Sequence, residues 1–196
     1  MKTVELSADL RHKIRQELDE KRFDHSLGVA YTCATLAFVH GGDIQQALTA
    51  GMLHDCAKCL SHEEKLKICK ENSIPVSESE AASPGLLHAK AGAYLAEHKY
   101  GVTDPEILNA IRCHTTGRPA MTRLDKLLYV ADYIEPNRKE LPQMDEIRRE
   151  AYRDLDACVL LILEHTMTYL KEKAKVLDPV TQETLLYYRK TLGKTD

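Results

Sequence analysis

Apolar residues recur at steps of three and four positions along most of the chain, which is the period of an amphipathic helix. The segment 24–40 illustrates this pattern, and Gly41-Gly42 then ends it as a helix stop. The apolar positions of this helix are Phe23, Leu27, Ala30, Ala34 and Ala37. No stretch alternates apolar β-branched residues with polar ones, as a half-buried strand does. The pattern therefore predicts an all-α fold.

Residues that cap helices mark the expected boundaries. Ser61 with Glu64 has the spacing of a capping box, and Asp104-Pro105 places an N-cap before a first-turn proline. The expected helices cover 7–20, 24–40, 43–58, 61–71, 85–99, 104–114, 122–134, 154–173 and 178–192, with a shorter helical stretch after Pro142. The segments 72–84 and 115–120 are expected to be loops. Since no repeat or linker separates these helices, we expect one helical domain over residues 1–196.

The composition is that of a globular protein, with 43% hydrophobic and 29% charged residues. A net charge of -3 and the lack of a basic run argue against nucleic acid as a partner. No apolar signal segment opens the chain, and no apolar run approaches the roughly 20 residues of a membrane span. We therefore expect a cytoplasmic protein that does not interact with membranes.

The six cysteines lie mostly among apolar neighbours, which suits reduced thiols better than a disulfide framework. Cys56 and Cys59 have a CxxC spacing. A thioredoxin-like site would need a βαβ context, and a four-cysteine zinc site would need a second close pair. Neither feature is present, so a redox or structural zinc role is not favoured.

The most unusual stretch is Gly51–Lys58, because it places His54 and Asp55 inside an apolar helical run. Asp55 follows Leu48 by seven residues, so it should face the core. Two ionisable side chains are costly to bury without a partner. A metal ion is the simplest partner, and a buried His–Asp hydrogen bond without an ion is the alternative.

Four further polar residues lie on or beside the apolar faces of their own helices: His25, His88, His114 and Asp132. One shared site would satisfy all six side chains. Four imidazoles and two carboxylates favour iron, manganese, cobalt, nickel or zinc over calcium or magnesium. The set suits two ions bridged by Asp55. One ion, with the remaining histidines in contact with the substrate, is the competing arrangement.

The ordered set His25, His54-Asp55, His88, His114 and Asp132 resembles that of the HD-domain phosphohydrolase superfamily. Four motifs make the resemblance closer to the bacterial YqeK family. They are Arg22-Phe23-Asp24-His25-Ser26-Leu27-Gly28-Val29-Ala30, His54-Asp55-Cys56-Ala57-Lys58, His114-Thr115-Thr116-Gly117 and Ala131-Asp132-Tyr133-Ile134-Glu135-Pro136-Asn137-Arg138. The resemblance implies a helical HD fold, an iron-containing centre and symmetrical hydrolysis of diadenosine tetraphosphate to two ADP. Family habit also implies a homodimer.

The resemblance also implies roles for individual residues. Metal ligands are expected at His25, His54, Asp55 and Asp132, and phosphate contacts or a second metal at His88 and His114. Among the substrate contacts, Thr115 and Arg138 are expected near the phosphates, and the nucleoside-side loop is expected at Lys175, Val176, Leu177, Asp178, Pro179 and Val180. In that loop, Leu177-Asp178 stands where the family pattern has an isoleucine–histidine pair before the proline.

The expected reaction is phosphoanhydride hydrolysis by a water molecule activated at the metal. Asp55, Lys58, His88 and His114 are the expected catalytic residues. Lys58 lies one helical turn after Asp55 and could reach phosphate oxygens, and His88 and His114 could ligate an ion or donate hydrogen bonds. Two alternatives remain. One is an HD hydrolase of a deoxynucleotide, a guanosine alarmone or a cyclic dinucleotide, and the other is a non-catalytic nucleotide-binding module.

Overall fold

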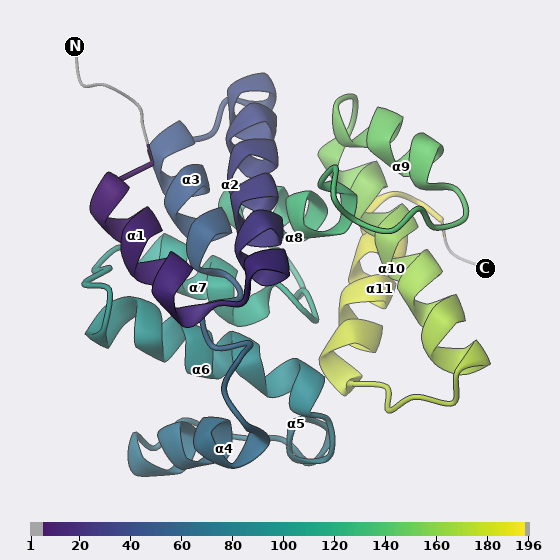
Figure 1. Cartoon of the computed structure of the whole chain (residues 1–196). Coiled ribbons are helices and arrows are strands. Elements are labelled where there is room, and N and C mark those ends of the chain that lie inside the picture. The colour runs from purple at the N-terminus through teal and green to yellow at the C-terminus, as the bar shows by residue number, and fades with distance from the viewer. Residues whose placement is uncertain (1–5, 195–196) are drawn as a thin grey trace.

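A computed structural model describes residues 6–194, which form eleven helices and no β-strand (Figure 1). The helices are α1 (Ala8–Glu17), α2 (Glu20–His40), α3 (Ile44–Leu53), α4 (His62–Glu71), α5 (Glu78–Ala82), α6 (Pro84–His98), α7 (Pro105–Cys113), α8 (Arg123–Ile134), α9 (Met144–Ala151), α10 (Leu155–Glu172) and α11 (Pro179–Thr191). The all-α prediction is confirmed. The prediction of one domain over 1–196 includes residues 1–5 and 195–196, which lie outside the described residues.

Side-chain caps explain most of the boundaries. Ser61 and Glu64 form the predicted capping box of α4, and Thr122 and Asp125 form another at the start of α8. Asp104 caps α7 by accepting a hydrogen bond from the backbone N–H of Glu106. Each of these helices therefore begins where a short polar side chain satisfies a free N–H group.

Two predicted boundaries near the first helices and one predicted loop were wrong. The chain breaks at Leu18, which is extended, and α2 begins at Glu20 because Asp19 accepts a hydrogen bond from the N–H of Arg22. The predicted loop 72–84 contains the short helix α5, which begins with a capping box between Ser77 and Glu80. The polar composition of this segment concealed that capping signal.

The prediction that the third helix continues through Asp55 to Lys58 was also wrong. Helix α3 ends at Leu53, and tight turns follow. In a continuing helix, the carbonyl of Gly51 would accept a hydrogen bond from a backbone N–H group of the next turn. Here it accepts one from the ring Nδ1 of His54 at 2.7 Å instead. The N–H of Lys58 instead bonds to the carbonyl of Asp55 at 2.8 Å.

Five central helices pack together and hold the rest of the molecule. Helix α3 packs against α2, α7 and α8, helix α2 also packs against α8, and α7 lies between α6 and α8. Helices α4 and α5 cover α6 along the lower edge in Figure 1, while α9, α10 and α11 form the group at the right, joined to α8 through α10 and α9. The six predicted ligands come from these five central helices or the residue or two after them.

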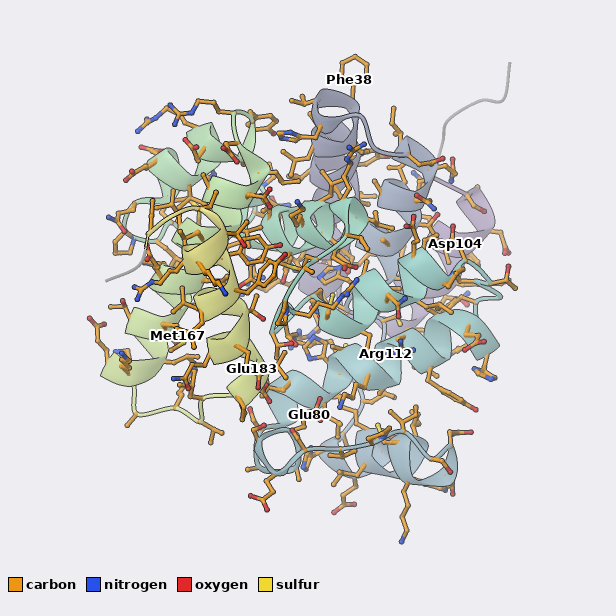
Figure 2. All side chains as sticks on the ribbon, turned by 180° about the vertical axis from the view of Figure 1, so that it is seen from behind. Phe38, Glu80, Asp104, Arg112, Met167 and Glu183 are labelled. Atoms are coloured by element: carbon orange, nitrogen blue, oxygen red, sulfur yellow. The ribbon has the colours of Figure 1, made fainter. Side chains whose placement is uncertain are left out.

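The core contains large apolar side chains from the central helices. Leu36 of α2, Leu53 of α3, Ile111 of α7 and Leu128 of α8 are all fully buried. Each contributes about 1.5–3 kcal/mol relative to an exposed position. The opposite face of α2 lies in solvent, where Phe38 is 76% exposed and projects outward at one end (Figure 2). Among the described residues, no helix has both the length and the apolar character needed to cross a membrane.

Helices α2 and α3 approach closely because Gly51 has no side chain. A Cβ at this position would lie 2.5 Å from the Cα and 2.8 Å from the N of Ala30, which are backbone atoms of α2. These atoms cannot rotate away as a side chain could. The close approach places the end of α3, and with it His54, directly against α2.

We expect Gly51→Ala to destabilise the fold on balance, because moving two packed helices apart costs about 1–3 kcal/mol. This cost exceeds the roughly 1 kcal/mol that alanine usually contributes over glycine inside a helix. Urea unfolding followed by circular dichroism measures the difference. Gly92→Ala in α6 is the matched control, since its Cβ would come no closer than 3.5 Å to any neighbour. Equal stability of the two variants would contradict the packing argument.

Candidate metal centre

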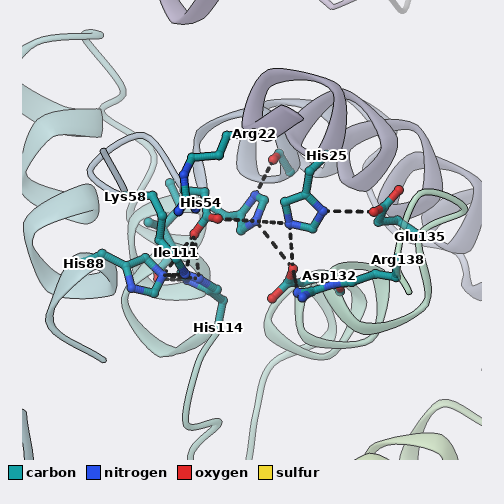
Figure 3. A network of polar contacts seen from close by, with 12 residues as sticks. Arg22, His25, His54, Lys58, His88, Ile111, His114, Asp132, Glu135 and Arg138 are labelled. Atoms are coloured by element: carbon teal, nitrogen blue, oxygen red, sulfur yellow. Dashed lines mark hydrogen bonds and ion pairs between the residues drawn. The ribbon is translucent and has the colours of Figure 1, made fainter. Parts of the chain in front are cut away.

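The six predicted ligands converge between the central helices (Figure 3). Their donor atoms form two groups. In the first, His25 Nε2 lies 3.3 Å from His54 Nε2, and Asp132 Oδ1 lies 3.0 Å from His25 Nε2 and 3.6 Å from His54 Nε2. In the second, His88 Nε2 lies 3.0 Å from His114 Nε2. We call these the first half-site (His25, His54, Asp132) and the second half-site (His88, His114).

Asp55 lies between the two half-sites, with one oxygen toward each. Its Oδ2 is 3.8 Å from His54 Nε2, while its Oδ1 is 3.0 Å from His88 Nε2 and 3.7 Å from His114 Nε2. Asp55, His54, His88 and His114 are buried, whereas the side chains of His25 and Asp132 are partly exposed. A carboxylate in this position can contribute to either half-site or bridge both.

Hydrogen bonds at Nδ1 orient three of the four rings. His54 and His114 bond to the carbonyls of Gly51 and Ile111, each at 2.7 Å, and His25 bonds to Glu135 Oε1 at 3.0 Å. An acceptor at Nδ1 places the ring proton there and leaves the Nε2 lone pair directed at the centre. This is the usual arrangement of metal-ligating histidines, whose other nitrogen is held by a carbonyl or a carboxylate.

The charges around the centre suit a cation. Burial acts to raise the pKa of Asp55, but His54, His114 and His88 outweigh it and hold that pKa well below its ordinary value. Burial lowers the pKa of His88 to about 4, so this ring is neutral at pH 7. Within residues 6–194, Asp55 Oδ1 accepts no hydrogen bond of good geometry. Buried nitrogen and oxygen acceptor atoms directed at one another fit a divalent metal centre.

Two cationic side chains lie beside the half-sites. Lys58 Nζ is 3.3 Å from Asp55 Oδ1 and 3.1 Å from His88 Nε2, because the turn after Asp55 directs it back toward the centre. Arg138 donates from Nε to the carbonyl of Asp132 at 2.7 Å and from Nη2 to Asp132 Oδ1. Each half-site therefore has a positive group at its edge.

A cavity of about 580 Å³ opens onto the first half-site. Its lining includes His25, Asp55, Lys58 and Arg138, together with Lys21, Arg22 and Lys139. The excess of basic side chains suits a polyanion of small size. Sequence reasoning assigned no role to Lys21, Arg22 or Lys139, although Arg22 belongs to the motif around His25, and that motif was the signal that could have identified it.

The predicted nucleoside-side loop lies elsewhere, and Thr115, which was predicted near the phosphates, lies beside it. Thr115 lines a second cavity of about 290 Å³ with Asp178, Pro179 and Val180. Both carboxylate oxygens of Asp178 form hydrogen bonds within the protein. One accepts a hydrogen bond from the N–H of Val180 at 2.9 Å, and the other accepts one from the hydroxyl of Ser79 at 2.5 Å. The remaining loop residues, Lys175, Val176 and Leu177, do not line either cavity.

Comparisons with known proteins cover this centre. The HD domain family model matches residues 22–137, which include all six predicted ligands. The symmetrical bis(5'-nucleosyl)-tetraphosphatase of Bacillus subtilis is 42% identical over 89% of this chain and 91% of its own length. The protein of the same name from Staphylococcus aureus is 37% identical over 89% of this chain and 90% of its own.

A solved structure agrees with these relatives. It is the crystal structure of a predicted HD superfamily hydrolase involved in NAD metabolism from Clostridium acetobutylicum, with 38% sequence identity and a TM-score of 0.91. The match covers 95% of this chain and 98% of that one. The central helices and the helices α9–α11 therefore both have counterparts in that structure.

We expect metal binding to release a proton from His54. Burial acts to lower the pKa of His54, but Asp55 and Asp132 outweigh it and raise that pKa above 6.5. A metal must displace this proton, so the apparent affinity for Zn²⁺ should rise with pH until His54 has lost it. Calorimetric titration in two buffers with different ionisation enthalpies counts the protons. Identical heats in both buffers would contradict the raised pKa of His54.

Proposed function

The chain belongs to the HD domain family and, within it, to the group of symmetrical bis(5'-nucleosyl)-tetraphosphatases, and from this premise we propose that it hydrolyses diadenosine tetraphosphate to two ADP. The observation that carries the proposal is the two half-sites joined by Asp55 beside a cavity lined with basic side chains. The relatives, at 37–42% identity over most of both chains, support the choice of substrate.

We propose that His25, His54, Asp132 and Asp55 hold one metal ion, and that His88 and His114, with Asp55, hold a second. A bound divalent metal lowers the pKa of water and neutralises phosphate charge. The mixed nitrogen and oxygen donor set suits iron, which is the metal we propose, and also accommodates manganese or another transition metal. A cytoplasmic location and a homodimer remain predictions from the sequence.

The protein side chains position the polyphosphate and balance its charge. Arg138 is directed at the first half-site through Asp132, and Lys58 at the second through Asp55. In this proposal each of these cations binds phosphate oxygens next to the attacked phosphorus, where negative charge develops in the transition state. His88 is neutral at pH 7 because burial lowers its pKa to about 4. A role as a ligand or a neutral hydrogen-bond donor therefore suits it better than general acid catalysis.

The substrate also carries two nucleosides, one at each end. We propose that Thr115 and the Asp178–Val180 segment contact a nucleoside through the second cavity. Because both carboxylate oxygens of Asp178 are engaged within the protein, its contribution would be to shape the cavity rather than to bond to the base. Lys175, Val176 and Leu177 lie outside that lining, and any contact would require the substrate to extend beyond it.

Chromatography of reaction products tests the proposed function. The protein is purified without oxygen, its metals are measured, and it is supplied with diadenosine tetraphosphate. ADP as the sole product supports symmetrical cleavage, whereas ATP with AMP contradicts it. A parallel panel contains a deoxynucleoside triphosphate, a guanosine alarmone and a cyclic dinucleotide. Faster turnover of any of these would replace the proposed substrate, and tight binding without turnover would indicate a binding module.

We expect His54→Ala to lose bound metal and hydrolysis together, because the variant removes a buried ligand. Activity should fall by roughly 10²–10³-fold or more, as when one transition-state stabilising group is removed. Elemental analysis and the ADP assay measure both quantities, and circular dichroism checks that the helices remain. A variant with normal metal content and full activity would exclude His54 from the centre.

Arg138→Ala should lower kcat/KM by roughly 10²–10³-fold while leaving the metal content unchanged, because its cation neutralises phosphate charge. Arg153→Ala is the matched control, since Arg153 is an exposed arginine that pairs only with Glu150 among the described residues. Its activity should equal that of the unaltered protein. Parallel loss of metal and activity in Arg138→Ala would indicate that Arg138 serves the metal site through Asp132.

A further inference from the structure

The four histidines of the centre differ in what holds the nitrogen that faces away from it. His54 and His114 bond to backbone carbonyls, and His88 Nδ1 has no hydrogen-bond partner among the described residues. His25 Nδ1 instead meets a carboxylate, Glu135 Oε1, at 3.0 Å. When a carboxylate accepts the hydrogen bond from one imidazole nitrogen, the other nitrogen becomes more basic and a stronger metal ligand. A neutral carbonyl has a smaller effect. His25 is therefore set apart from the other three.

Glu135 is held in this position. It is 1% exposed, and its backbone caps the end of α8. Its Oε1 faces His25, and its Oε2 accepts a hydrogen bond from the backbone N–H of Asn137 at 2.7 Å. Within the described part of the chain, no lysine or arginine forms an ion pair with Glu135. The direct side-chain partner of its carboxylate is therefore His25.

A glycine provides the space for this carboxylate. Gly28 lies in the middle of α2, one turn after His25, and a Cβ there would be 2.4 Å from Glu135 Oε2. Glycine weakens a helix interior, so its presence here requires a reason. The missing side chain lets Glu135 enter from α8 and reach His25 across the junction of the two helices.

The two half-sites consequently differ in charge. Around the first lie Asp132, the shared Asp55 and Glu135, with Arg138 as the opposing cation. Around the second, the shared Asp55 faces Lys58, and the other two ligands are imidazoles, which bring no carboxylate. The first half-site has more negative charge for a cation to neutralise. It should therefore bind a divalent metal more tightly.

We propose that Glu135 is a positioning residue for His25, and that it makes the first half-site the tighter of the two, so that the first half-site fills before the second. The carboxylate fixes the ring with Nε2 toward the metal and strengthens that nitrogen as a ligand. This inference rests on the metal centre of the proposed function but not on the identity of the substrate.

Titration of the metal-stripped full chain with Co²⁺, followed by visible absorption, tests the inference. The unaltered protein should show a tight and a weak class of site with different spectra. Glu135→Gln keeps the shape but removes the charge, and its single oxygen can serve only one of the two hydrogen bonds. The tight class should weaken by about 10–100-fold, the range seen when outer-shell partners of metal ligands are changed. The weak class should keep its affinity and its spectrum.

Gly28→Ala tests the same contact from α2. Its methyl group should displace the Glu135 carboxylate and weaken the tight class by a similar factor, even though alanine favours the helix. In a Glu135→Ala background the added methyl group meets no carboxylate, so Gly28→Ala should cause no further loss. Additive losses in the double variant would overturn the proposed link between Gly28 and Glu135.

Glu140→Gln is the matched control, because Glu140 is an exposed carboxylate near the same loop that pairs with Arg148 at 2.7 Å. Both classes should be unchanged in this variant. Equal weakening of both classes by Glu135→Gln, accompanied by a lower melting temperature of the metal-stripped protein, would show a merely structural role. An unchanged tight class would also overturn the inference. The Co²⁺ titration could give the expected result while the protein fails to hydrolyse diadenosine tetraphosphate. That outcome would refute the proposed substrate but not the role of Glu135.

Discussion

The centre of this molecule depends on buried electron pairs that are directed at one another. Nε2 atoms of four histidines and the oxygens of Asp55 and Asp132 meet at separations of 3.0–3.8 Å, in part at positions without solvent access. Such an arrangement is unfavourable unless a proton or a metal ion lies between the acceptors. Because the predicted ligands lie on five helices or just after them, an ion bound by them would also tie those helices together.

Two of the predicted ligands are oriented by the same local hydrogen bond. His54 and His114 are the C-caps of α3 and α7, and each ring bonds back to the carbonyl three residues earlier at 2.7 Å. This bond ends the helix, fixes the ring proton on Nδ1 and directs Nε2 toward the centre. The carbonyl ends of both helices also place partial negative charge near the site, which favours a cation. The same hydrogen bond thus both ends the helix and orients the ring.

Much of the fold was predictable because helical periodicity and caps are local signals, and they also identified six inward-facing polar residues. The end of α3 was not predictable from periodicity, since it depends on the His54 ring competing for a carbonyl. The contact between Glu135 and His25 joins residues 110 positions apart and requires the space at Gly28. Spacing along the chain carries no information about such a contact. The same limit applies to Asp178, whose partner Ser79 lies 99 positions away.

The cavity opens on the half-site with more negative charge, and this position bears on the proposed reaction. Its lining contains His25, Asp55, Glu135 and Arg138, whereas His88 and His114 lie behind Asp55, away from the opening. A phosphate entering the cavity therefore meets the first half-site before the second, between Arg138 and Lys58. The more negative half-site is the one that most needs a bound cation before a polyanion can approach, because otherwise its carboxylates would repel the phosphate. If the first half-site fills first, as we propose, its ion would neutralise this charge before the substrate binds, and the deeper half-site would contribute afterwards.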